Sequence, residues 1–459
     1  MRVAGVPRGT PAICTSVHLP SGTAAVARTR PLCTRPPRAV RFPQQGDARP
    51  LTAIRLQVTL IADGSHCRDP TATEEVNVAT FGIEEEFQFL DPDTLFPVDV
   101  GAQAFEHLST MPEWQGVTHR EFLASQIEHA SAVFEKMEDA HAAMTGFRRA
   151  VADQAAELGV IVASIGTPPD TTAFPTITDT ERYQRIVRTM DAVIADHQVS
   201  GLHVHVGIPS REAGVIVLNA VRPWLPLFTA IAANSPLWRG QDTGHDSWRT
   251  VLLRRWTTSG CPPAFLDAAD YDRRIARLLG IGGTVDLGVI MWDVRLSEHL
   301  PTIEFRVADA QLDAQTTLFI TALCRAFVAH SLGVPAAQAA AASASAQMPS
   351  ELLSAALLHS AHHGMDRQVF DPLRGGLAPA HGCLRRFVRM LEPELVELGD
   401  VELVREAVAR LRVDGTGAAQ QRAAFSRGGR PELRRLLTRT MTPARRAERV
   451  TVAAGAILG

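Results

Sequence analysis

The sequence is poor in lysine and carries few cysteines. Among 46 basic residues, Lys136 is the one lysine. A Walker-type phosphate loop and Schiff-base chemistry both need a lysine, so the sequence argues against both. The six cysteines are scattered, with no CxxC pair and no ligand-like spacing. This pattern argues against a structural zinc site and a disulfide scaffold, and it fits a reducing cytoplasm.

The sequence also lacks a strong net charge and a long apolar run. The net charge is −3, so no basic field indicates a nucleic-acid partner. We find no apolar run near the roughly 20 residues that span a bilayer. The most apolar predicted helices, such as 318–332, are interrupted by charged or polar residues, there Arg325 and His330. We therefore expect a soluble, cytoplasmic protein that binds neither nucleic acid nor membrane.

The 459 residues divide into regions of different composition. Residues 1–75 are rich in Arg, Pro, Ala and Thr with little periodicity, which is typical of a disordered tail or a misassigned translation start. A transit peptide has a similar composition. We expect a catalytic domain over residues 76–445, with an Ala/Ser-rich loop or linker at 334–350, a helical part at 351–445 and a tail at 446–459.

Strand and helix patterns alternate through this domain. Strands are predicted at 81–90, 160–164, 202–206 and 303–307. Helices are predicted at 100–108, 134–158, from about 179, at 211–233, and at 384–398, 401–411 and 432–438. Strands interleaved with helices, followed by a helical tail, predict an α+β fold in which a sheet forms one wall of a site.

The stretch FGIEEEF, residues 81–87, places acidic residues on a strand. Side chains alternate between faces along a strand, so Glu84 and Glu86 share one face and Ile83, Glu85 and Phe87 share the other. Adjacent carboxylates repel each other, unless a divalent cation such as Mg²⁺ or Mn²⁺ binds them. An edge strand that carries charges against aggregation is the structural alternative.

Two later strands carry further metal-binding residue types. In GLHVHVG, His203 and His205 share a strand face, and in TIEFR, Glu304 and Arg306 do. Taken separately, these could be half-buried histidines and a simple ion pair, and an HxH strand also occurs in metal-dependent hydrolases. Together with Glu84 and Glu86, these residues indicate a site where Mg²⁺ or Mn²⁺ binds a nucleotide and an arginine binds its phosphate.

Several long motifs resemble the carboxylate–amine ligase family, also called type-2 glutamate–cysteine ligases, of the glutamine synthetase-like superfamily. They are FGIEEEF, GLHVHVG, ANSPLWRGQDTGHDSWR, WDVRLSEHLPTIEFRVAD and GTGAAQQR, which occur in family order over about residues 78–440. The resemblance implies a curved, largely antiparallel sheet with flanking helices that carries metal and ATP.

The resemblance also implies roles for individual residues. Catalytic roles fall on Arg306, which would bind phosphate, and on His205, which would lie near the substrate. Other positions in family motifs resemble substrate- or nucleotide-facing loops. The implied metal ligands are Glu84, Glu86, His203, Glu304 and Glu128; the nucleotide-binding residues are Arg306, Arg249 and Arg295; and the remaining loop positions are Arg182, Tyr183, Asn234, Arg239 and Asp242.

The implied reaction joins a carboxylate to an amine through an acyl phosphate, at the expense of ATP, with Mg²⁺ or Mn²⁺. The family's named substrates are glutamate and cysteine, and relatives are often oligomers. A phosphotransferase that uses the same site, a metal-dependent hydrolase and a degenerate binding protein are the alternatives. Two departures, His245 and the stretch 357–364, are expected to border the substrate pocket and to affect the choice of substrate.

Overall fold

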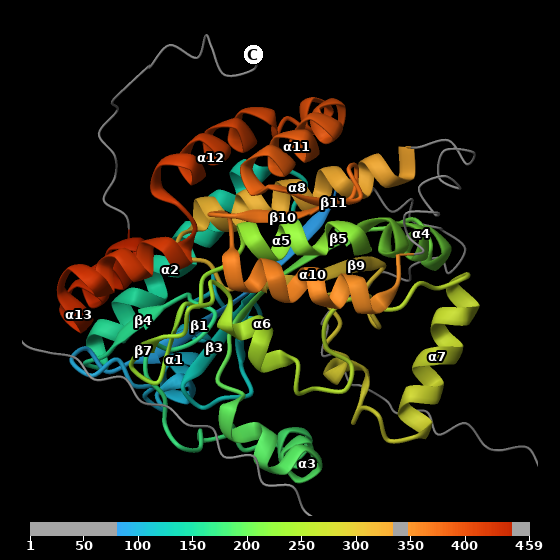
Figure 1. The fold of residues 1–459 in the computed structure, drawn as a ribbon. Coiled ribbons are helices and arrows are strands. Elements are labelled where there is room, and N and C mark those ends of the chain that lie inside the picture. Colours follow the sequence, from blue (N-terminus) through green and yellow to red (C-terminus); the bar gives the residue numbers. More distant parts are fainter. Residues whose placement is uncertain (1–79, 334–347, 443–459) are drawn as a thin grey trace, which may run out of the picture. The chain divides into compact units, whose positions relative to one another are not determined.

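The computed structural model describes residues 80–333 and 348–442 (Figure 1). The predictions for residues 1–75, for most of the Ala/Ser-rich stretch at 334–350 and for the tail at 446–459 therefore lie outside the described residues.

An antiparallel sheet of seven strands organises the described residues, in the order β2-β3-β1-β5-β9-β8, with β4 also pairing with β1. Every pairing in this sheet is antiparallel. The predicted α+β class and largely antiparallel sheet are confirmed. The strands are β1 (Phe81–Leu90), β2 (Thr118–Arg120), β3 (Gln126–Ala130), β4 (Ile161–Ala163), β5 (Gly201–Gly207), β8 (Val294–Leu296) and β9 (Thr302–Asp309).

Helices cover the apolar face of the sheet (Figure 1). Ile83, Val204 and Phe305, one from each central strand, are at most 2% exposed and belong to one core cluster. Helix α8 packs against β5, and α5 packs against β9. The helices of this part are α2 (Met137–Glu157), α4 (Arg211–Val221), α5 (Leu225–Ile231), α8 (Ala314–Gly333), α10 (Ser350–His363), α11 (Ala380–Glu397), α12 (Val401–Asp414) and α13 (Gly417–Met441).

Smaller elements surround this framework. The predicted helix at 134–158 begins three residues later, at Met137, and the helix predicted from about 179 begins at Glu181. Short strands such as β8 offered too few residues for a periodic pattern to be visible. The remaining elements are α1 (Gly101–Leu108), α3 (Glu181–Met190), α6 (Trp248–Leu253), α7 (Ala268–Gly280), the hairpins β6 (Leu237–Trp238)–β7 (Gln241–Asp242) and β10 (Gln368–Asp371)–β11 (Gly376–Pro379), and the 3₁₀ turns Asp191–Asp196, Arg222–Trp224 and Leu287–Val289.

Two segments are long and apolar enough to span a membrane, contrary to the expectation from the sequence. They are Arg211–Ile231 and Ala314–Gly333, and 83% and 72% of their apolar windows are buried inside the protein. The sequence scan missed them because Arg222 and Arg325 interrupt the runs, yet both side chains are buried. Extensive burial within the protein is what core helices of a soluble protein show.

The third glutamate of FGIEEEF has a structural role on the helix-covered face. Glu85 is fully buried and accepts hydrogen bonds from Arg148 of α2, including Nε to Oε2 at 3.0 Å, and from Thr317 Oγ1 at 2.7 Å. Arg148 also donates to the carbonyls of Gln311 and Leu312 at 2.7 and 2.8 Å. The buried pair thereby joins β1 to α2 and to the start of α8.

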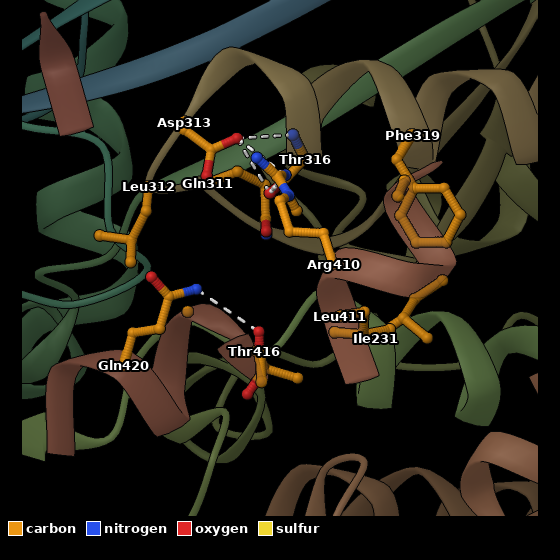
Figure 2. A pocket seen from close by; sticks show the side chains of 13 residues that line it. Ile231, Gln311, Leu312, Asp313, Thr316, Phe319, Arg410, Leu411, Thr416 and Gln420 are labelled. Carbon is orange, nitrogen blue, oxygen red and sulfur yellow. Dashed lines mark hydrogen bonds and ion pairs between the residues drawn. The ribbon is translucent and has the colours of Figure 1, made fainter. Parts of the chain in front are cut away.

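A small cavity lies where α12 and α13 meet the start of α8 (Figure 2). Its volume is about 20 Å³, and Arg410 closes one side by donating to Asp313 Oδ1 at 3.0 Å and to Thr316 Oγ1 at 2.6 Å. This space holds about one water molecule, which is too little for a substrate.

Candidate active site

Strand register gathers the predicted site residues on the sheet face opposite the helical core. Glu84 lies opposite His203 across β1 and β5, and Glu86 lies opposite Glu128 across β1 and β3. Directly opposed residues in a sheet share a face, so the paired positions bring these side chains together. The face alternation predicted for all three motif strands is confirmed, because the residues between them are in the core.

A cavity of about 260 Å³ opens over this face. Of the predicted catalytic, nucleotide-binding and metal-binding residues, all except His205 and Glu304 line it, and those two form a ligand group with Glu84, which does line it. Apolar side chains, among them Phe122, Ile186 and Trp256, form another part of the wall. The charged and histidine lining residues are Glu84, Glu86, Glu121, Glu128, Arg182, His197, His203, Arg249, Arg295 and Arg306.

Two groups of side chains in this region have ligand atoms close enough to share a cation. Within each group all ligand atoms lie within 4.8 Å of one another, and Glu84 belongs to both. His203 Nδ1 is 2.9 Å from Glu84 Oε2, and His205 Nε2 is 3.2 Å from Glu84 Oε1. The groups are Glu84, Glu128 and His203, and Glu84, His205 and Glu304.

The donor set fits a divalent cation. His205 Nδ1 contacts Thr302 Oγ1 at 2.9 Å, while its buried Nε2 points toward Glu84 Oε1 at 3.2 Å without forming a well-aligned hydrogen bond. One ring nitrogen held by a hydroxyl and the other directed at a carboxylate oxygen is an arrangement that suits a histidine ligand. Carboxylates dominate both groups, and carboxylate oxygens suit Mg²⁺ or Mn²⁺.

Electrostatics divide the carboxylates into two kinds. Burial opposes ionisation of Glu84 and Glu304, yet the pKa of each lies far below its ordinary value. His203 and His205 stabilise the ionised carboxylate of Glu84. Arg306 and Arg295 stabilise that of Glu304. Burial raises the pKa of Glu86 to about 8, with repulsion from Glu121 adding to the shift.

Glu128 and Glu121 belong to the second kind. Burial and the charge of Glu84 raise the pKa of both carboxyl groups. Without a cation, therefore, part of this acidic cluster prefers to hold protons. Glu121 was not predicted as a site residue, because no motif surrounds it and only the fold brings it to the cavity.

The guanidinium of Arg295 forms hydrogen bonds with acceptors of the protein itself. Its Nε and Nη2 donate to Glu304 at 2.6 and 3.2 Å. Its Nη1 donates to the carbonyls of Leu287, Gly288 and Ile290 at 3.0 to 3.1 Å. Arg295 lines the cavity as predicted, and these contacts show it orienting Glu304 and the turn that forms the cavity rim.

Arg249 is held in place by a buried network around Asp309. Asp309 Oδ2 accepts from Ser235 Oγ at 2.7 Å, and its Oδ1 accepts from Ser247 Oγ at 2.9 Å. The guanidinium of Arg249 lies 3.9 Å from Asp309 and donates from Nη2 to the carbonyl of Arg306 at 3.2 Å. The network thus connects a cavity-lining arginine to the strand that carries Glu304 and Arg306.

Three further residues from the motifs lie outside the cavity, and of these Asn234 contacts the Asp309 network. Asn234 donates from its backbone N–H to Asp309 at 2.8 Å and accepts from Gln421 Nε2 at 2.7 Å. Arg239 pairs with Asp196 at the surface, and Asp242 accepts from Arg422. Of the loop positions expected to face substrate or nucleotide, only Arg182 and Tyr183, with Arg249 and Arg295, reach the cavity.

The two departures from the family pattern do not border this cavity. Neither His245 nor any residue of 357–364 is among the described residues that line it. They lie together elsewhere, where the loop before α6 meets the end of α10. The expectation that they border the substrate pocket is not met at this cavity, because His245 packs on His362 of α10 instead, with ring centroids 4.5 Å apart.

Comparison with known proteins identifies the family to which the chain belongs. Residues 80–439 match glutamate–cysteine ligase family 2. A protein of Saccharopolyspora erythraea named "Putative glutamate–cysteine ligase 2-1" is 38% identical over 349 residues, covering 76% of this chain and 90% of its own. A protein of Salinispora tropica named "Putative glutamate–cysteine ligase 2" is 38% identical over 362 residues, covering 79% and 94%.

Solved structures show the same fold at low identity. The glutamate–cysteine ligase of Francisella tularensis, in complex with AMP, has a TM-score of 0.54 at 11% identity and covers 80% of this chain and 89% of its own. The bifunctional glutathione synthetase of Pasteurella multocida has a TM-score of 0.54 at 14% identity; the match covers 79% of this chain and about half, 52%, of that one. By sequence and by fold, the chain belongs to glutamate–cysteine ligase family 2 and is a ligase.

Proposed function

We propose that the protein is an ATP- and Mg²⁺-dependent carboxylate–amine ligase, with glutamate as the carboxylate and cysteine as the amine. The observation that carries the proposal is the pair of ligand groups that share Glu84 directly beside Arg306. Two cation positions next to an arginine suit the transfer of a phosphoryl group. The names of the relatives support the choice of glutamate and cysteine.

The cation would be held by Glu84, Glu128 and His203, and a second by Glu84, His205 and Glu304. When bound, Mg²⁺ would neutralise charge on the ATP phosphates. Glu86 lies at the edge of the first group, with its Oε1 3.9 Å from His203 Nε2, while its Oε2 accepts from the backbone N–H of Gly201 at 2.8 Å.

Arg306 and Arg249 supply positive charge on the same cavity wall. A carboxylate oxygen of the substrate attacks the γ-phosphorus, the bond from that phosphorus to the ADP oxygen breaks, and an acyl phosphate forms. The amine then attacks the acyl carbon, phosphate leaves with the bonding electron pair, and the nitrogen loses a proton. Arginine side chains that face the cavity stabilise the negative charge that develops in the first step.

The apolar part of the cavity protects the intermediate. Phe122 packs edge-on against Tyr183 and His197, with ring centroids at 5.3 and 5.8 Å. Trp256 donates from Nε1 to His197 Nδ1 at 3.0 Å, so this histidine is neutral, and burial lowers its pKa to about 3. An uncharged aromatic corner beside the charged face limits the water that could hydrolyse an acyl phosphate.

The test is ADP release from ATP and Mg²⁺ with glutamate, cysteine, single carboxylates and carboxylate–amine pairs, with mass spectrometry of the products. We expect ADP only when a pair is present, together with a product of the summed mass minus one water. ADP with one substrate and a phosphorylated product would instead identify a phosphotransferase. Bound ATP without turnover on any pair would favour a binding role.

A further inference from the structure

A cluster of histidines lies away from the ligase cavity, on the helix α10 and the loop before α6. The rings of His245 and His362 stack with their centroids 4.5 Å apart, and His362 stacks on His363 at 4.2 Å. His359 contacts His363 edge-on at 4.6 Å. The cluster unites the two departures from the family pattern, which are more than 100 positions apart in the sequence.

Two of these imidazoles have one ring nitrogen fixed by a backbone carbonyl. His245 Nδ1 lies 3.3 Å from the carbonyl of Thr243, and His359 Nε2 lies 2.9 Å from that of Gln368. A carbonyl accepts hydrogen bonds only, so in each ring the contacting nitrogen carries the proton and the other nitrogen has a lone pair. Metal-binding histidines characteristically donate their second ring nitrogen to a carbonyl or carboxylate in this way.

The two segments that carry the cluster are fixed to each other. The backbone N–H groups of Asp246 and Ser247 both donate to the carbonyl of Ala361, at 2.8 and 2.9 Å. Gly364 ends α10 with φ of 51°, and a side chain there would collide with Asp246. The imidazoles therefore meet on a rigid base, although His362 is exposed at the surface and can rotate.

We propose that His245, His359 and His363, with His362 as an alternative ligand, bind a borderline divalent cation such as Zn²⁺. Imidazole nitrogens favour Zn²⁺, Ni²⁺ or Cu²⁺, whereas Mg²⁺ favours the carboxylates of the ligase cavity. His359 and His363 are one helical turn apart, the spacing at which two histidines on one helix face can bind the same ion. The rings stack rather than converge: among the described residues, no three of these imidazoles have ring nitrogens within 4.8 Å of one another. Binding therefore requires side-chain rotation, which is freest for the exposed His362 and more restricted for the three half-buried histidines.

His363 is central to the cluster, because its ring contacts those of both His359 and His362. The bound ion would join α10 to the loop that leads through Ser247 to Arg249.

The experiment is equilibrium dialysis of the full chain against ⁶⁵Zn²⁺ with excess Mg²⁺, which occupies the carboxylate site. We expect the double variant His359→Gln/His363→Gln to lose at least about tenfold in Zn²⁺ affinity. His299→Gln is the matched control, because that histidine is 83% exposed and lies outside the cluster, and it should bind Zn²⁺ as the parent does.

The variants also separate this site from other sources of Zn²⁺ binding. Equal affinity in the double variant and the parent, or loss of binding in Glu84→Gln instead, would overturn the proposal. Unchanged thermal unfolding of the double variant without Zn²⁺ shows that its fold is intact. The EPR spectrum of bound Cu²⁺ gives a second readout: fewer nitrogen hyperfine lines in His359→Gln/His363→Gln than in the parent, with Mg²⁺ in excess, support ligation by the cluster, and an unchanged spectrum counts against it. Because ligase turnover is not measured, the result is independent of the proposed function.

Discussion

At the scale of single residues, Glu84 is central to the proposed site, because it belongs to both groups of candidate metal ligands. Glu84→Gln keeps the size of the side chain and removes its charge, and Arg306→Ala removes the arginine beside Glu304. We expect either change to lower ATP turnover by at least about 100-fold, as loss of a charge-stabilising group does. Glu113→Gln, at an exposed position, is the control. Full turnover in both site variants would show that the residue assignment is wrong.

A second residue-scale prediction concerns pH. The pKa of Glu86 is raised to about 8, so the metal-free folded protein holds a proton that the unfolded chain loses near pH 4.5. Stability of the metal-free protein should therefore fall as pH rises between about 4.5 and 8. Mg²⁺ must displace this proton, so its affinity should rise with pH, by up to about tenfold per unit for each proton released.

Thermal unfolding with and without Mg²⁺ at pH 6 and pH 8 measures both effects. The upward shift caused by Mg²⁺ should be larger at pH 8. In Glu86→Gln the difference between the two pH values should shrink, and an identical shift in the parent at both values would count against proton displacement.

The sequence predicted site residues best on strands, where side chains alternate between the two faces of the sheet. Glu84, His203 and Glu304 could be predicted because each lies on a strand motif in which the residue two positions later points to the same face. Glu121 could not be, since it reaches the cavity only through the fold. The hydrogen bonds of Arg295 could not be predicted either, because a turn at 287–290 brings the accepting carbonyls to its side chain.

At the scale of elements, a buried ion pair connects β1 to α2. Arg148→Met would leave the fully buried carboxylate of Glu85 without its partner. We expect a loss of about 3–5 kcal/mol in the free energy of unfolding, measured by urea denaturation. Arg149→Met changes the next residue, which is exposed, and should cost far less. Adding Glu85→Gln should recover part of the loss; no recovery would mean that packing rather than charge dominates.

The Asp309 network is the second element-scale feature, because it couples the 234–249 segment to β9. Asp309→Asn keeps the shape and removes the charge that faces Arg249. We expect kcat/KM for ATP to fall about 10- to 100-fold, as loss of an orienting partner does. Steady-state kinetics should place the change in ATP-dependent turnover, while thermal unfolding shifts only modestly. Asp272→Asn, at an exposed position, is the control. Parent-like kinetics would make the network purely structural.

Element prediction succeeded for long periodic segments and for the short buried strand β4, and it missed the short strands β2 and β8. The strand at 81–90 and the helix at 100–108 stand out by alternation and by helical spacing. Strands β2 and β8 are three residues long and are defined by their partners in the sheet rather than by a pattern of their own. The motif GTGAAQQR was recognised without its role, since Gln421 meets Asn234 only through tertiary packing.

At the scale of the whole molecule, the family match begins at residue 80 and ends at 439. We therefore expect a chain that starts at residue 76 to retain the ligase activity of the full chain within about twofold. Parallel measurement of ADP release and thermal unfolding for both chains checks this. A truncated chain that folds but is inactive would assign residues 1–75 a part in the reaction.

The most direct test of the central claim follows an oxygen atom from the substrate. Glutamate labelled with ¹⁸O in its carboxyl groups is incubated with ATP, Mg²⁺, cysteine and the protein, and the released phosphate is analysed by mass spectrometry. An acyl phosphate transfers one carboxylate oxygen to phosphorus, so ¹⁸O should appear in the phosphate at the rate of amide formation, and not in Glu84→Gln. Amide formation with unlabelled phosphate, or release of AMP in place of ADP, would contradict the account.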